Sequence, residues 1–349
     1  MAIVRFIGDI HLGKRPSHST RASAQRHKEK VDKVIRQVCD NEADLVIQLG
    51  DLFDSYQATN NDMVRAAYLH ENTNLILKGN HDHSHSSFNV SALEDLEKLQ
   101  KHGAHIVTEP EVHTCGAGEH YYVHFVPYMP TQTEFIAALA KMAPVKGSVN
   151  ILCLHTNMYA EGFSVSEVEN NLPEITAREL CHDFDLVISG HEHCGRQKHG
   201  VYMAGCLFPM NFGDISDKYV LDFDTDTKEV TPVPVWSAEG TYPQENSVAP
   251  VGAQYARLDP QEFLGVPVLH GYDFIEIYGN VQTTDILQLV KHMNLLLAES
   301  GVSSIKNGVK VIRETADEDG PKEAGNWLDY VKESLKPEQF ELLQELRDD

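Results

Sequence analysis

Aspartate, asparagine and histidine recur in five short motifs, and each motif follows a run of strand-forming residues. The motifs are Asp9-Ile10-His11, Gly50-Asp51, Gly79-Asn80-His81-Asp82, His155 and Gly190-His191-Glu192-His193. An apolar run that ends in Gly-Asp or Gly-Asn predicts a buried strand that leads into a loop. In α/β architectures such loops at strand ends hold the side chains that carry chemistry. We therefore expect a layered fold in which all five motifs meet at one edge of the sheets.

The hydrophobic pattern between the motifs predicts alternating strands and helices up to about residue 225, and the pattern and composition of the sequence change beyond it. The segment 239–267, rich in proline, glycine and polar residues, is interpreted as a linker. Strands are expected over 2–7, 44–49, 74–77, 120–127, 149–154, 186–188, 271–278 and 309–313, and strands predominate between 201 and 224. Helices are expected over 20–41, 63–70, 92–101 and 284–299, with helical character again over 326–346.

The chain is longer than one typical domain, so we expect three parts. Residues 1–235 would form the main domain, a sandwich of two mixed sheets flanked by helices. Residues 236–315 would form a linker and a small α+β capping domain. Residues 316–349 would form a helical segment that binds a partner or packs on its own catalytic domain, because its apolar residues outnumber those that short isolated helices can bury.

Composition restricts the classes of protein that the chain can belong to. The formal net charge is −23, which argues against a protein that holds nucleic acid mainly through its own basic surface. If the substrate is DNA, local basic patches, bound metal or a partner must supply the positive field. No run of eighteen apolar residues predicts a membrane span, and the charged motif at Asp9 leaves no room for a signal peptide. The six cysteines form no CxxC pair, which is typical of reduced thiols in the cytoplasm.

Carboxylate and amide oxygens together with imidazole nitrogens are ligands that suit manganese, iron or zinc. A lone carboxylate can bridge two ions, and Asp51 is the natural bridge, while Asn80 adds a neutral oxygen. Two ions roughly 3.5–4 Å apart activate a water and bind phosphate oxygens. Any one motif is weak evidence, since a lone histidine is more often structural than a ligand. Five motifs in this order, each after a strand, predict a two-metal hydrolytic site.

This set of motifs resembles the calcineurin-like metallophosphoesterase superfamily. Within it, GDIHLG at residue 8 and GDLFD at residue 50 resemble the SbcD-type nuclease subunits of DNA double-strand-break repair, including phage recombination endonucleases. A third likeness runs from Ala204-Gly205-Cys206 through Phe212-Gly213-Asp214. The resemblance covers about residues 1–225, and beyond it only the layout of a capping domain followed by helices is similar.

The resemblance implies two sets of metal ligands that share one aspartate. The first ion would be bound by Asp9, His11, Asp51 and His193. The second would be bound by Asp51, Asn80, His155 and His191. Both ions would be divalent, manganese by preference, with iron, zinc or magnesium as alternatives.

Three further residues are candidate catalytic groups. The resemblance implies that His81 lies beside the scissile phosphate as a proton donor or charge stabiliser. Asp82 would orient His81 by a hydrogen bond and hold it cationic, or would only stabilise its loop. Many of these nucleases have a histidine three residues after the bridging aspartate, where this chain has Asp54. An ionised carboxylate cannot donate to a phosphate oxygen, so we interpret Asp54 as a residue that orients a histidine behind the metal ligands.

The resulting hypothesis is a manganese-dependent DNA exonuclease and endonuclease for DNA end processing, recombination and repair. It would act in the cytoplasm, that of the host if the chain is encoded by a phage. Its partners would be DNA and an SMC-like ATPase subunit of the SbcC type, with a homodimer as a further option. Two alternatives stay open: a phosphatase or cyclic-nucleotide phosphodiesterase acting on other substrates, and a metal-stabilised scaffold without catalysis.

Overall fold

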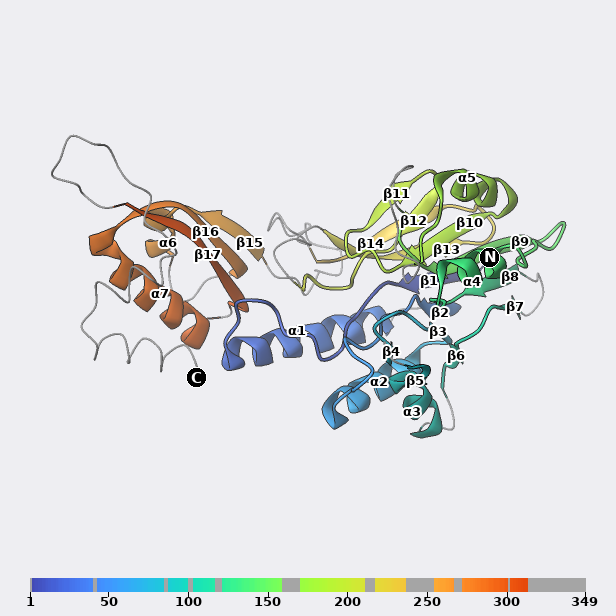
Figure 1. Ribbon diagram of the computed structural model, residues 1–349, viewed down its shortest axis with the longest axis horizontal. Helices are drawn as coiled ribbons and strands as arrows, with labels where there is room; N and C mark the ends of the chain where they lie inside the picture. Colours follow the sequence, from blue (N-terminus) through green and yellow to red (C-terminus); the bar gives the residue numbers. More distant parts are fainter. Residues whose placement is uncertain are drawn as a thin grey trace.

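The structure is a computed structural model that describes ten stretches of the chain. They are residues 2–39, 43–84, 87–99, 103–116, 121–158, 170–210, 217–236, 254–266, 272–300 and 302–312. The predicted C-terminal segment 316–349 lies outside the described residues. Figure 1 shows two sheets and their helices on the right, and a smaller sheet with its helices on the left, with one long helix between them.

The first sheet joins four parallel strands to an antiparallel pair in the order β14-β13-β1-β2-β3-β6. Its strands are β1 (Ile3–Ile7), β2 (Leu45–Gln48), β3 (Leu75–Leu77), β6 (His105–Val107), β13 (Lys218–Asp224) and β14 (Val230–Trp236). The strands β1, β2 and β3 confirm three predicted strands to within a residue or two. All three are short and almost wholly buried, as expected of parallel strands covered on both faces.

The second sheet is also mixed, in the order β11-β12-β10-β9-β8-β7, with an antiparallel strand at each edge and parallel strands between them. Its strands are β7 (Glu111–Cys115), β8 (Tyr121–Val126), β9 (Val149–His155), β10 (Leu186–Gly190), β11 (Arg196–Lys198) and β12 (Val201–Met203). Phe6, Ile47, Phe125 and Ile151 meet between the sheets in one buried cluster, so the two sheets form a sandwich.

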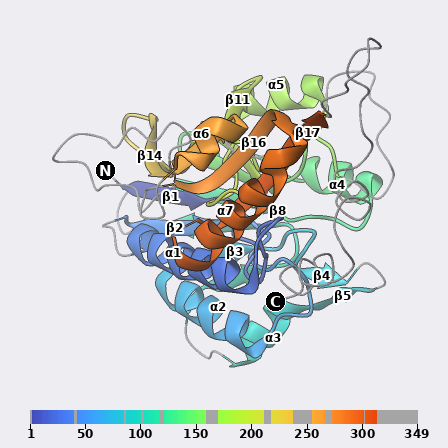
Figure 2. The same cartoon turned by 90° about the vertical axis from the view of Figure 1, so that its left-hand side faces the viewer.

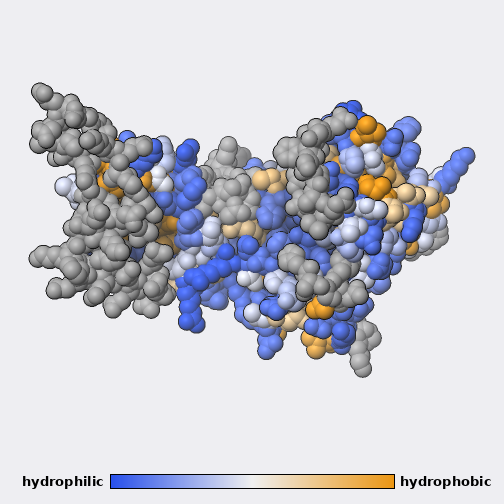
Figure 3. Space-filling view, in the orientation of Figure 1, coloured by the Kyte–Doolittle hydropathy of each residue, from blue (hydrophilic) through white to orange (hydrophobic). Residues whose placement is uncertain are grey.

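Helices cover the outer face of each sheet, which confirms the expected sandwich of mixed sheets flanked by helices. The helices α1 (Arg21–Cys39), α2 (Asn60–Asn72) and α3 (Ala92–Leu99) pack on the first sheet, and α4 (Gln132–Leu139) and α5 (Glu174–Asp183) pack on the second. A two-stranded ribbon of β4 (His83–Ser84) and β5 (Ser87–Ser91) follows the third motif. None of the described helices is long and apolar enough to cross a membrane. Hydrophilic residues cover most of the described surface in Figure 3.

A third sheet of three parallel strands lies beside the sandwich. It contains β15 (Gln254–Leu258), β16 (Tyr272–Gln282) and β17 (Ser304–Ile312), with α6 (Pro260–Leu264) after β15, and the 3-10 turn Thr283–Asp285 and α7 (Ile286–Glu299) after β16. Each helix therefore connects two parallel strands, so this small unit of strands and helices is a βαβαβ arrangement.

The predicted linker over 239–267 is wrong for its second half, where β15 and α6 lie. The sequence Asp259-Pro260-Gln261-Glu262 forms a capping box: Asp259 accepts hydrogen bonds from two backbone amides, and Glu262 accepts one from the Asp259 amide. Phe263, just inside this helix, is fully buried. The density of proline and polar residues therefore marks a helix start here, not an irregular connection.

The sandwich and the third sheet meet along α1, as the turned view in Figure 2 also shows. Phe274 of β16 belongs to the same buried cluster as Val31 and Val34 of α1. The guanidinium of Arg26 donates to the backbone oxygens of Ala298 and Val302, at 3.5 and 3.3 Å. The helix that begins just after the first motif thus supports both units.

Candidate metal centre

All five motifs lie where strands of the two sheets end. Asp9 and His11 follow β1, Asp51 follows β2, and Asn80 follows β3. On the second sheet His155 is the last residue of β9, and the loop with His191 and His193 follows β10. The carboxyl ends of parallel strands share one edge of a sheet, and the two sheets present these edges together.

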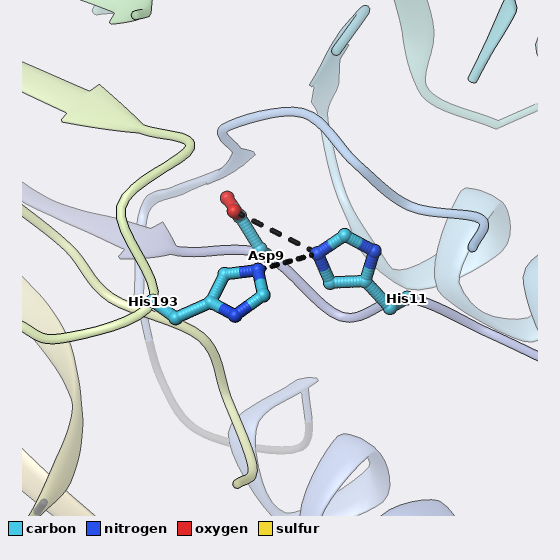
Figure 4. Close-up of side chains that lie close together, drawn as sticks. All are labelled: Asp9, His11 and His193. Atoms are coloured by element: carbon cyan, nitrogen blue, oxygen red, sulfur yellow. Dashed lines mark hydrogen bonds and ion pairs between the residues drawn. The ribbon is translucent and has the colours of Figure 1, made fainter. Parts of the chain in front are cut away.

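One group of donor atoms forms around His11. Its Nε2 lies 3.0 Å from Nε2 of His193, 3.9 Å from Oδ2 of Asp9 and 3.7 Å from Oδ2 of Asp51. Figure 4 shows Asp9 and His11 from the loop after β1 pointing toward His193 from the loop after β10. His11 and Asp9 are nearly fully buried. Together with His193 they form a group that could hold a metal ion.

A second group forms around His155 and includes the same aspartate. Nε2 of His155 lies 3.5 Å from Oδ1 of Asp51 and 3.0 Å from Oδ1 of Asn80. Nδ1 of His191 lies 2.7 Å from that asparagine oxygen and 3.3 Å from Nε2 of His155. Asp51 therefore directs one carboxylate oxygen to each group, which is the arrangement that a bridging ligand requires.

The backbone at three of these positions is strained. His11, Asp51 and His191 have φ angles of 49°, 51° and 85°, in the left-handed region that side chains with a Cβ rarely adopt. Such conformations cost of order 1–3 kcal/mol each and persist where the surrounding structure imposes them. Here they turn the side chains out of the strand direction and toward the other motifs, so the strain is concentrated in the residues that form the site.

Two motif glycines leave room for these side chains. A Cβ at Gly79 would lie 2.2 Å from Oδ1 of Asp51, and a Cβ at Gly50 would lie 2.3 Å from Nδ1 of His155. Gly50 also has a φ of 101°. No other residue type fits these places without displacing a donor, so the Gly-Asp and Gly-Asn pairs in the sequence have a steric cause.

The electrostatics of the site fit a divalent cation. Burial raises the pKa of Asp9 to about 7, against the attraction of His155. Burial acts on Asp51 in the same direction, but the charge and hydrogen bond of His155 hold its pKa below the usual range. Burial lowers the pKa of His11 and of His191 to about 3. Neutral imidazoles are the form that binds metal, and buried carboxylates need a nearby cation to stay charged. Against the effect of burial, Asp51 raises the pKa of His155 to about 9, so a metal ion bound here would displace the proton of that ring.

His81 lies at the margin of both groups and is held by backbone contacts. Its amide donates to Oδ1 of Asp51 at 2.8 Å, and its Nδ1 lies 2.9 Å from the backbone oxygen of Asp54. Its ring lies 4.8 Å from that of His11, centroid to centroid. The structure thus places His81 beside the candidate ligands, in a further group with His11 and Asp51 that could hold a metal ion, and the contact of its Nδ1 orients the ring.

Asp82 does not orient His81, contrary to one of the two interpretations of the sequence. Its carboxylate oxygens accept hydrogen bonds from the backbone amides of Phe53 and Gly79, both at 2.9 Å, and within the described chain His81 is not among its partners. It is fully buried, and burial raises its pKa to about 6. Asp82 therefore joins the second motif loop to the third, which was the loop-stabilising alternative.

Asp54 lies near His11, which is a candidate ligand and not the histidine behind the ligands that was expected. Its Oδ1 is 3.6 Å from Nδ1 of His11 and 3.0 Å from Nζ of Lys14. The contact with His11 is longer than a hydrogen bond, so the carboxylate acts on this ring through charge rather than through a shared proton.

Sequence reasoning missed two residues that position the ligands. Nδ2 of Asn157 lies 2.6 Å from Nε2 of His191, which leaves Nδ1 of that ring facing Asn80. Lys218 is buried, and its ammonium donates to the backbone oxygen of His193 at 2.8 Å. Asn157 follows His155 by two residues, which is a weak signal, whereas nothing in the sequence connects Lys218 to the site.

A comparison with curated proteins finds no match. Among solved structures, one crystal structure is 10% identical to this chain, with a TM-score of 0.39. The match covers 66% of this chain and 98% of the chain in that structure. The structure of Haemophilus influenzae NAD nucleotidase is 12% identical with a TM-score of 0.39, covering 67% of this chain, which spans 49% of the length of that nucleotidase.

The family model described as calcineurin-like phosphoesterase matches residues 4–195, more than half of the chain. The matched region begins in β1 and ends just beyond His193, so it contains all five motifs. Members of this family hydrolyse phosphoesters with divalent metal ions, which is the chemistry that the donor groups around Asp51 fit. The chain belongs to the calcineurin-like phosphoesterase family.

Proposed function

We propose that the chain is a metal-dependent nuclease that hydrolyses phosphodiester bonds in DNA. The observation that carries this proposal is a basic cavity of about 250 Å³ beside His11. The loop after β1, the start of α1 and the start of α2 line it. Five cationic side chains and one carboxylate, Asp62, take part in the lining. The cations are Lys14, Arg15, Arg21, Lys28 and Arg65.

Much of this positive charge is not compensated locally. Arg65 pairs with Asp32 at 2.5 Å and with Asp62 at 3.5 Å. Arg15, Arg21 and Lys28 form no ion pair with a carboxylate of the described chain. A chain with a net charge of −23 therefore concentrates positive charge beside its metal centre. Phosphates next to the scissile one in a polynucleotide would use these cations, whereas a small monoester would have no phosphate to place there.

The candidate ligands divide naturally at Asp51. Asp9, His11 and His193 would hold one ion with one oxygen of Asp51, and Asn80, His155 and His191 would hold the other with its second oxygen. Mixed oxygen and imidazole ligands suit manganese. When bound, such a metal pair activates water and stabilises charge on the phosphate oxygens. His81 supplies a proton or a positive charge to the phosphate, which the metal ligands cannot do. It does so from its Nε2, because its Nδ1 is held by the backbone oxygen of Asp54.

The test compares two substrates across matched variants. Arg21→Ala and Lys28→Ala should each lower manganese-dependent turnover of linear DNA severalfold and leave turnover of a nitrophenyl phosphodiester unchanged. The slope of log affinity for DNA against log salt should fall by about 0.9 for each phosphate that the variant no longer neutralises. Lys146→Ala, an exposed lysine after α4, is the control and should behave like the unmodified chain.

Two results would contradict this assignment. Equal losses on both substrates would mean that these cations support the metal centre and not DNA. Rapid turnover of the nitrophenyl ester with none of DNA would favour the phosphatase or cyclic-nucleotide alternative.

We also propose that an SMC-like ATPase of the SbcC type acts with this chain. The resemblance of the motifs and the negative net charge support a partner that contributes to holding DNA. The segment expected to bind it, 326–346, lies outside the described residues.

A further inference from the structure

A separate cluster of side chains that could hold a metal ion lies where the chain passes from one sheet to the other. His105 is the first residue of β6, the last strand of the first sheet. Glu111 and His113 lie on β7, the last strand of the second sheet. Only residues 108–110 separate the two strands. The three side chains form a group that could hold a metal ion, and it shares no member with the groups around Asp51.

The donor atoms converge on one point. Nε2 of His105 lies 2.7 Å from Oε1 of Glu111, and Nε2 of His113 lies 3.2 Å from the same oxygen. The two imidazole rings are 5.0 Å apart, centroid to centroid. Ligand atoms around a tetrahedral ion with bonds of about 2.0–2.1 Å lie about 3.3 Å from one another. The spacing here is close to that at the metal centre, where the Nε2 atoms of His11 and His193 lie 3.0 Å apart.

Strand geometry fixes this convergence. Side chains alternate along β7, so Glu111 and His113 share one face while Val112 between them is 47% exposed on the other. The ring of His113 packs edge-on against Phe125 of the neighbouring strand β8, at 5.6 Å between centroids. The backbone of His105 is held by its amide, which donates to the oxygen of Asn74 at 2.9 Å. Two of the three ligand positions are therefore fixed by the fold, not by flexible loops.

We propose that His105, Glu111 and His113 bind one zinc ion that joins the edges of the two sheets. Two imidazole nitrogens and one carboxylate oxygen form a ligand set that zinc takes in proteins, with water in a fourth position. The side chains are 48%, 35% and 29% exposed, so an ion reaches them from solvent. Because the three ligands come together only in the folded chain, zinc bound here stabilises the folded state over the unfolded one.

The test measures zinc content on the full chain and does not depend on the nuclease proposal. Protein stripped with a chelator is dialysed against zinc and analysed for metal, as the unmodified chain and as His113→Gln, Glu111→Gln and His182→Gln. The first two variants should each bind one zinc ion fewer per chain. His182→Gln, an exposed histidine on α5, is the matched control and should bind as much as the unmodified chain.

Hydrogen exchange shows where the zinc ion that the variants lose is bound in the unmodified chain. Zinc should slow exchange over residues 105–115 in the unmodified chain and not in Glu111→Gln, whose amide keeps the size of the carboxylate. Manganese-dependent phosphoester turnover should be unchanged in both cluster variants, which shows that they fold. Equal zinc content in all four proteins, or protection by zinc that persists in Glu111→Gln, would overturn the proposal and leave a surface ion pair between Glu111 and the two histidines.

Discussion

Replacing His27 with leucine should reduce the loss of folding stability at acid pH by about 2 kcal/mol. His27 lies on α1 with 2% of its surface exposed, and its ring packs against Phe208 and Phe274 at 4.7 and 6.0 Å between centroids. Burial lowers its pKa from 6.5 to about 3, with smaller contributions from Lys30 and Arg65. Nδ1 has no hydrogen-bond partner in the part of the chain that the structure describes. The folded state therefore holds this histidine neutral.

The lowered pKa fixes the sign and the size of the effect. Between the folded and unfolded pKa values the unfolded chain binds the extra proton, so the free energy of unfolding falls as pH drops below about 6.5. At pH 5 an unfolded histidine with a pKa of 6.5 gains about 2 kcal/mol from protonation, and the folded one gains almost nothing. This figure stays the same if the folded pKa is 4 instead of 3, because both values lie well below pH 5.

Urea unfolding at pH 8 and pH 5, with a chelator present so that bound metal does not contribute, measures this difference. The loss of unfolding free energy between the two pH values should be about 2 kcal/mol smaller for His27→Leu than for the unmodified chain. His182→Gln should keep the full loss, because that histidine is exposed. A His27→Leu protein that loses as much stability as the unmodified chain would refute the reasoning.

Three further predictions concern the metal centre and the C-terminal segment. Asp51→Ala should abolish phosphoester turnover and lower bound metal at both sites, because this residue gives one oxygen to each donor group; two ions retained in folded protein, by elemental analysis, would rule out a bridge. His81→Ala should keep both metals and lose about 10²–10⁴-fold in turnover, the usual contribution of a general acid; near-normal rates would remove it from the mechanism. Truncation after Asp319 should leave metal-dependent turnover intact and end co-purification with an SMC-like ATPase, whereas retained binding would show that the tail is not the docking segment.

The alternation of short strands with ligand motifs could be predicted, because neighbouring residues in the sequence determine it. Short apolar runs followed by Gly-Asp or Gly-Asn indicated β1, β2 and β3, and helical spacing indicated α1 and α7. Local cues also explain two failures. The short helices α4 and α5 lie in segments where no helix was predicted, although Thr131 caps α4 by accepting from the amide of Glu134. The capping box at Asp259 was hidden among proline and polar residues that were interpreted as a linker.

The sequence alone identified the candidate metal ligands, because the five motifs contain both the donor side chains and the glycines that make room for them. How these donors meet depends on the folded arrangement. His11 and His193 stand 182 positions apart, and their ring nitrogens come within 3.0 Å because two sheets pack with their strand ends together. The same packing brings Lys218 of the first sheet to the backbone of His193, and the pairing of β2 with β3 brings the amide of Phe53 to Asp82. Such contacts depend on strand order, register and sheet packing, which are set by burial across the whole core, and no local pattern encodes them.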